Sequence, residues 1–124
     1  MLTDGEVPFR ATSETVGAAV VVQVAGELDC ATVDELSDRL GAAVRAVVPP
    51  SPVVVDLTGL RFLGAEGIGL LLNHQDLCLR RGSALVVVAN NAAVLRPLQV
   101  LELVDVLGVR SCVLDALTLP EVRA

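Results

Sequence analysis

Cysteine and histidine are the residues that most often carry covalent or metal chemistry, and this sequence has three of the first and one of the second. Cys30, Cys78 and Cys112 are odd in number and far apart, which is not the pattern of a disulfide framework. No Cys-x-x-Cys pair is present, so we expect no metal site. A reversible disulfide between Cys78 and Cys112 stays open as a redox switch. His74 lies in a polar stretch, where we expect it to be solvated.

The segment DLTGLRFLGAEGIGLLL, residues 56–72, reads as the end of a buried strand followed by the start of an apolar helix. Such junctions are where α/β proteins usually place their chemistry. Its centre, LGAEGIG, offers a single acid, Glu66, and no nucleophile–base pair. Gly67-x-Gly69 lacks the third glycine of a dinucleotide fingerprint. The junction therefore favours a binding surface over an active site, and we expect no enzymatic activity and no cofactor.

The composition narrows the classes of partner. The formal net charge is −6, every positive charge is an arginine, and Arg80-Arg81 is the only adjacent basic pair. Two phenylalanines are the only aromatic residues, so base stacking and phosphate tracking are poorly supported and we expect no nucleic-acid partner. No apolar run approaches the ~18 residues of a membrane span, and the first residues lack a signal-peptide layout. We expect a cytoplasmic protein with no membrane partner, in an oligomeric state that the sequence does not define.

Hydrophobic periodicity predicts Val-rich strands alternating with amphipathic helices, and hence a mainly parallel sheet with an antiparallel first pair. Thr32 and Glu35 form a capping-box pattern that predicts a helix start near residue 32. We expect one domain at residues 9–119, with tails at 1–8 and 120–124. The predicted strands are 9–14, 18–25, 52–59, 84–90 and 104–109, and the predicted helices are 32–48, 66–81, 92–103 and 111–119.

Two motifs in this layout resemble those of STAS domains, the fold of bacterial anti-sigma factor antagonists. GELDCATVDEL, residues 26–36, is similar to the family's turn into its first helix, and residues 53–72 are similar to its central signature. VLRPLQVLELVDVL, residues 94–107, resembles the third helix and its exit. The resemblance covers about residues 9–119. It implies an α/β STAS fold with a mostly parallel, mixed sheet of about five strands and four helices.

The resemblance also implies a function, which is partner switching. A family member binds an anti-sigma factor, typically an ATP-binding protein kinase, and so frees a sigma factor. The kinase then phosphorylates a Ser or Thr at the start of the second helix, and the added charge ends the binding. The family usually reads Asp-Ser-x-Gly at this point, whereas this sequence reads Gly64-Ala65-Glu66-Gly67. Ala65 therefore occupies the phosphoacceptor position without a hydroxyl group.

Some of the expected contact residues have a second interpretation that the sequence leaves open. Glu66 either imitates a phosphate or only complements the helix dipole, and Asp29 either recognises the partner or only shapes a turn. Thr58 is an alternative phosphoacceptor, although threonine is common just after a strand. The residues expected to bind the partner are Asp29, Phe62, Leu63, Gly64, Ala65, Glu66, Gly67 and Ile68.

Two other classes of function compete with the antagonist hypothesis. A non-catalytic STAS scaffold, in another signalling assembly or beside a transporter, would carry the same motifs. An enzyme is less well supported, because no metal cluster, phosphate loop or nucleophile–base pair is apparent in the sequence.

Overall fold

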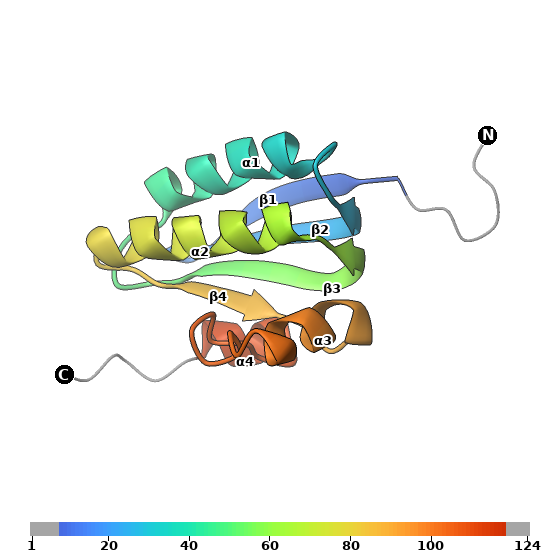
Figure 1. Ribbon diagram of the computed structural model, residues 1–124. Coiled ribbons are helices and arrows are strands. Elements are labelled where there is room, and N and C mark those ends of the chain that lie inside the picture. The colour runs from blue at the N-terminus through green and yellow to red at the C-terminus, as the bar shows by residue number, and fades with distance from the viewer. Residues whose placement is uncertain (1–7, 119–124) are drawn as a thin grey trace.

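The Val-rich segments form a mixed β-sheet that carries helices on both of its faces (Figure 1). The computed structural model describes residues 8–118. Both predicted tails therefore lie outside the described residues, except for Pro8, and so does Leu119, the last residue of the predicted domain. The elements in chain order are β1 (Arg10–Val16), β2 (Ala19–Leu28), α1 (Val33–Ala46), β3 (Val53–Leu63), α2 (Ala65–Arg80), β4 (Leu85–Val88), α3 (Ala92–Val100) and α4 (Val113–Leu117).

The strands follow one another across the sheet in the order β1-β2-β3-β4. β1 and β2 pair antiparallel, which confirms the predicted first hairpin, and the β2–β3 and β3–β4 pairs are parallel. β3 is longer than predicted and continues to Leu63, so Phe62 and Leu63 are strand residues and not loop residues. Only Gly64 then separates β3 from α2.

The fifth strand predicted at 104–109 is wrong, since the sheet has four strands in the described part of the chain and this segment forms turns. Its backbone N–H groups are used locally: Leu107 N–H donates to Leu103 O, and Val109 N–H to Val104 O. Gly108 adds a residue with φ +58°, which an extended strand does not contain. A single parallel bridge from Arg110 to Val88 on β4 is what remains of the expected pairing.

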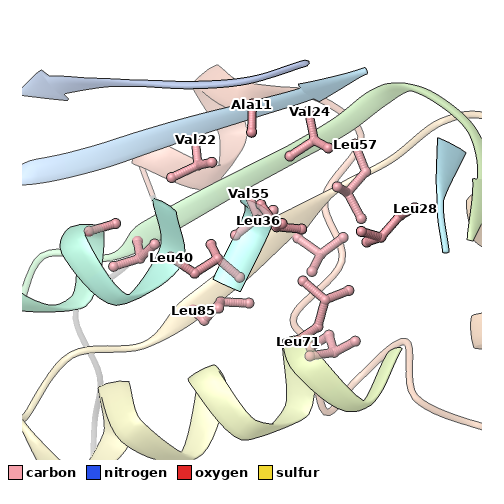
Figure 2. Close-up of a cluster of buried hydrophobic side chains, with 14 of the residues drawn as sticks. Ala11, Val22, Val24, Leu28, Leu36, Leu40, Val55, Leu57, Leu71 and Leu85 are labelled. Atoms are coloured by element: carbon pink, nitrogen blue, oxygen red, sulfur yellow. The ribbon is translucent and has the colours of Figure 1, made fainter. Parts of the chain in front are cut away.

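The main hydrophobic core lies between the sheet and the two helices α1 and α2 (Figures 1 and 2). Side chains alternate between the two faces of a strand, and Val22, Val55 and Leu85 point to this face. Leu36 and Leu40 of α1 and Leu71 of α2 are fully buried against them. Valine, leucine and alanine thus fill the core, as the near absence of aromatic residues requires.

The opposite face of the sheet is covered by α4 over β3 and β4. Ala116 of α4 is fully buried in a second, smaller cluster with Val54 and Val88. On β1 and β2, by contrast, this face carries polar side chains such as Thr12 and Gln23, which are exposed. Among residues 8–118, therefore, nothing covers the part of this sheet face on β1 and β2.

Two polar residues of α2 turn inward, contrary to the expectation for His74. His74 is buried at 5% exposure, with Nδ1 2.9 Å from Leu70 O. The Gln75 amide accepts a hydrogen bond from Leu85 N–H at 2.8 Å and donates to Leu85 O at 3.0 Å and Val106 O at 2.9 Å. Gln75 thereby ties α2 to the edge strand β4 and to the turns that replace the fifth strand.

Candidate functional site

The candidate site is the corner where β2 and β3 end side by side and α2 begins; we call Asp29 and residues 62–68 the corner. Leu28 pairs with Leu63 in the parallel register, and Gly64 donates its backbone N–H to Leu28 O at 2.9 Å. Asp29 follows Leu28 directly and is therefore held beside Gly64. The fold thus brings together the two motifs that lie in residues 26–36 and 53–72.

The exposed part of the corner consists of Phe62, Ala65 and Glu66. Phe62 is 48% exposed at the end of β3, which is unusual for an aromatic side chain in a protein with only two of them. Gly64 and Asp29 are partly exposed beside these three side chains. A partner that reached this surface would meet an apolar ring, a methyl group and an acid.

The other predicted contact residues are buried and unavailable for direct contact. Leu63 is 6% exposed, Ile68 is 7% exposed, and Gly67 is also buried. They belong to the layer that fixes α2 on the sheet, so their role in the corner is structural support.

The start of α2 leaves its first backbone N–H groups without a side-chain cap. Gly64 is the N-cap, with φ −88° and ψ 174°, a conformation open to any residue, and it forms no side-chain cap hydrogen bond. Glu66 folds back toward it, with Oε1 3.5 Å from the position that a Gly64 Cβ would take. This geometry fits the interpretation of Glu66 as an acid that complements the positive end of the helix.

Gly67, in contrast, is required by packing. A Cβ at Gly67 would lie 2.6 Å from Leu28 Cδ2 and 3.0 Å from Leu63 Cδ1, whereas a Cβ at Gly69 would meet nothing within 4 Å. We expect Gly67→Ala to lower the free energy of unfolding by about 1–3 kcal/mol because it overpacks the base of the corner. Gly69→Ala should raise it by about 0.5–1 kcal/mol through helix propensity alone. Urea unfolding of both variants measures these free energies. Equal effects would show that Gly67 does not lie as close to Leu28 and Leu63 as the structure places it.

Asp29 shapes the turn that joins β2 to α1. Its Oδ1 accepts the Ala31 N–H at 2.9 Å, and its own N–H donates to Thr32 Oγ1 at 3.1 Å. Thr32 is the N-cap of α1 as predicted, yet its hydroxyl donates back to Glu27 O at 2.8 Å and makes no capping bond to the helix. The predicted capping box is therefore wrong, and at least part of the role of Asp29 is to set this turn.

Sequence reasoning missed Glu27 and Cys30 as neighbours of the corner. Glu27 is exposed and pairs with Phe62 across the β2–β3 register, and Cys30 is exposed in the Asp29 turn. Both motifs end at the same edge of the sheet. Parallel pairing of the two strands was therefore the signal that could have placed Glu27 beside the corner.

Thr58, the alternative phosphoacceptor, points away from the corner onto the open sheet face. Its hydroxyl donates to Asp56 Oδ1 at 2.7 Å and its N–H donates to the same oxygen at 3.0 Å. Asn91 lies at the start of α3, where its amide donates to Leu57 O at 3.2 Å and Leu60 O at 2.7 Å. Asn91 thus anchors α3 to the part of β3 that leads into the corner.

The structure disfavours the redox switch. Cys78 is fully buried on the α2 face of the sheet, and its carbonyl accepts the N–H of Ser83, just before β4. Cys112 is exposed at the start of α4, on the opposite face and beyond the far end of β4, where Arg110 pairs. A disulfide needs Cα atoms within about 7 Å, and a sheet lies between these two residues.

The thiols should differ sharply in reactivity. Burial raises the pKa of the Cys78 thiol from 9.0 to about 11, with the Arg81 charge opposing the shift in part. We therefore expect Cys30 and Cys112 to react rapidly with a thiol reagent at pH 8, and Cys78 to react only as the protein unfolds. Because the unfolded thiol ionises first, Cys78 should also reduce stability between about pH 9 and 11, and Cys78→Ala should remove this loss. Rapid labelling of all three thiols in the native protein would contradict the placement of Cys78.

Residues 8–118 contain no group of three or more Cys, His, Asp or Glu side chains that could hold a metal ion. In the same part of the chain, no helix is long and apolar enough to cross a membrane.

Comparison with known proteins gives a consistent match. Residues 11–111 match the family model described as Mlab, STAS domain. The anti-sigma-F factor antagonist RsfA of Mycobacterium tuberculosis is 32% identical over 110 residues, which are 89% of this chain and 86% of RsfA.

Solved structures agree with this match. An anti-sigma factor antagonist from Mycobacterium paratuberculosis aligns with a TM-score of 0.81 at 30% identity, covering 91% of this chain and 96% of its own. Unphosphorylated SpoIIAA aligns with a TM-score of 0.68 at 21% identity over 86% of this chain and 92% of its own, which supports the shared fold. The chain therefore belongs to the STAS domain family.

Proposed function

We propose that this protein is an anti-sigma factor antagonist, which binds an anti-sigma factor through the corner and thereby frees a sigma factor. The observation that carries the proposal is the exposed Phe62 ring beside the uncapped start of α2. Relatives that cover nearly the whole chain are named as antagonists of this kind.

We infer an anti-sigma factor of the ATP-binding kinase type, in the cytoplasm, with no nucleic-acid or membrane partner. Ala65 is the first residue of α2 and has no hydroxyl, so a kinase could not release this protein by phosphorylating that position. The protein itself performs no catalysis in this scheme.

A binding screen tests the proposal. The full chain is immobilised and exposed to each anti-sigma factor kinase of the source organism, with and without ATP. We expect one kinase to bind, and the complex to survive ATP. If the chain instead retains a transporter or a large scaffold assembly and binds no anti-sigma factor, the alternative STAS scaffold function would replace this one.

The position of the binding surface has its own test, a pair of charge reversals. We expect Glu66→Arg to weaken binding by about tenfold, because it replaces an exposed acid in the corner by a bulky cation. Asp115→Arg makes the same change in net charge on the exposed side of α4 and should leave the affinity within a factor of about two. Titration calorimetry with the cognate anti-sigma factor measures both. Equal losses would place the interface elsewhere.

A further inference from the structure

The open face of the sheet contains a hollow that the proposed function does not use. It has a volume of about 350 Å³, which is within the range of small-molecule sites. Polar side chains from three strands surround it: Arg10 and Thr12 from β1, Gln23 from β2, and Asp56 and Thr58 from β3.

A β-bulge lies beside the hollow. Gln23 pairs with Asp56 and Ala25 pairs with Gly59. Between these two pairs, β3 therefore contains one more residue than β2. Asp56 and Thr58 share this face as alternate residues of a strand do, and the extra residue brings Gly59 to the same hollow, although a regular strand would turn it to the other face. Bulges often occur beside functional sites because they redirect side chains in this way.

The floor of the hollow is low because its residues are small. Ala25 has one methyl group and Gly59 has none, and a Cβ added to Gly59 would lie only 3.2 Å from Ala25 Cβ. A ligand on this floor would touch the sheet surface directly, between the longer side chains of the rim.

The rim carries charged groups of both signs, and several of its polar side chains are unbonded. Within residues 8–118, the side chains of Arg10, Thr12 and Gln23 form no hydrogen bond or ion pair with one another or with other residues. Asp56 faces them from the other side, with Oδ1 held in place by the Thr58 hydroxyl and N–H. β1 and β3 are about 10 Å apart, two interstrand spacings, and Arg10 on β1 and Asp56 on β3 both line the hollow between them.

We propose that this hollow binds a small zwitterion, a free amino acid or a dipeptide, between Arg10 and Asp56. The guanidinium group of Arg10 takes the carboxylate of the ligand, a pairing for which its fork of N–H donors is suited. The carboxylate of Asp56 takes the ammonium group. The Gln23 amide and the Thr12 hydroxyl bond to the polar atoms between the two ends.

A phosphate or nucleotide fits the same groups less well. Its multiple negative charge would meet Arg10 on one side but the Asp56 carboxylate on the other, in a protein with a net charge of −6. A ligand with one charge of each sign avoids this repulsion.

Amide NMR spectra of the full chain, titrated with glycylglycine, test the proposal. We expect the Gln23 side-chain amide and the backbone amides of Thr58 and Gly59 to shift in a saturable way at millimolar concentrations. N-acetylglycylglycine lacks the ammonium group and glycylglycinamide lacks the carboxylate, so each should bind about tenfold more weakly. No shift, equal binding of the capped peptides, or equally strong binding of inorganic phosphate would overturn the proposal.

Two substitutions test which residue binds each charged end of the ligand. Arg10→Gln and Asp56→Asn should each weaken glycylglycine binding by about tenfold, and Asp56→Asn keeps the oxygen that holds Thr58. Arg39→Gln, an exposed site on α1, is the matched control and should bind as the unaltered protein does. The amide spectrum of each variant shows whether it is folded. If Asp56→Asn is unfolded, the affinity of Arg10→Gln for glycylglycine decides the test, and an unchanged affinity would refute the site. Since none of these measurements involves an anti-sigma factor, their outcome is independent of the proposed function.

Discussion

Replacing Phe62 by alanine is expected to weaken binding to the anti-sigma factor by about 30-fold or more. Residues that dominate an interface are typically aromatic, and their truncation costs at least ~2 kcal/mol, which corresponds to that factor. Phe62 is 48% exposed, and its ring lies beside Gly64, with Cε2 3.1 Å from the position that a Gly64 Cβ would take. The ring therefore presents apolar area next to the start of α2, where a partner could cover both at once.

Leu79→Ala provides the control for this measurement. Leu79 is 60% exposed, so its truncation also removes exposed apolar area. It lies near the other end of α2, and fourteen residues of helix place it about 21 Å from Ala65. Affinities measured by calorimetry should fall for Phe62→Ala and stay unchanged for Leu79→Ala. An unchanged affinity for Phe62→Ala would remove the main support for binding at the corner.

The sequence predicted the elements whose pattern is strong and local. The Val-rich runs of β2, β3 and β4 and the helices α1 and α2 all lie where periodicity put them, to within a few residues. The antiparallel first hairpin also followed, because a short turn at Gly17 cannot make a parallel connection. Of the corner, the family resemblance predicted that Asp29 would lie beside the loop at Gly64, and the hydrogen bond from Gly64 N–H to Leu28 O places the two segments side by side.

The errors arise where tertiary contacts decide. The segment 104–109 is apolar enough for a strand, but Gly108 and local N–H donors turn it back on itself, and Gln75 bonds to its Val106 carbonyl. Thr32 fits a capping box in sequence, yet its hydroxyl is engaged by Glu27 O.

His74 shows the same limit on α2. The polar residues around it predict exposure to solvent, whereas its position, three residues after Leu71 and four before Cys78, lies on the buried face of α2. Periodicity was the stronger signal at this position, and the residue type misled.

Adding a hydroxyl group at the start of α2 is expected to create a phosphorylation site there. The unaltered protein has Ala65 at that exposed position, and we expect no label there after incubation with the cognate kinase and radiolabelled ATP. Ala65→Ser places a hydroxyl at the first residue of the helix without a backbone change, so slow labelling should appear. Gly64→Asp combined with Ala65→Ser should be labelled faster, because it also restores the acid that usually precedes the acceptor in the family.

The structure sets what the double variant must accommodate. The backbone of Gly64, at φ −88° and ψ 174°, admits a side chain without strain, but the new Cβ would require the Phe62 ring to move by a few tenths of an ångström. It would also lie 3.5 Å from Glu66 Oε1, and the exposed Glu66 side chain can turn into solvent to reduce the repulsion. The free energies of unfolding of the three proteins should therefore differ by less than ~1.5 kcal/mol. Differences in labelling rate then report on recognition by the kinase.

Phosphate on the double variant should weaken the complex, since it adds a charge of about −1.5 to −2 in the middle of the binding surface. Label on the unaltered protein at Thr58 or at another residue of 56–68 would show that this surface is controlled by phosphorylation after all. A kinase that binds all three proteins and labels none would show that Ala65 does not occupy the acceptor position.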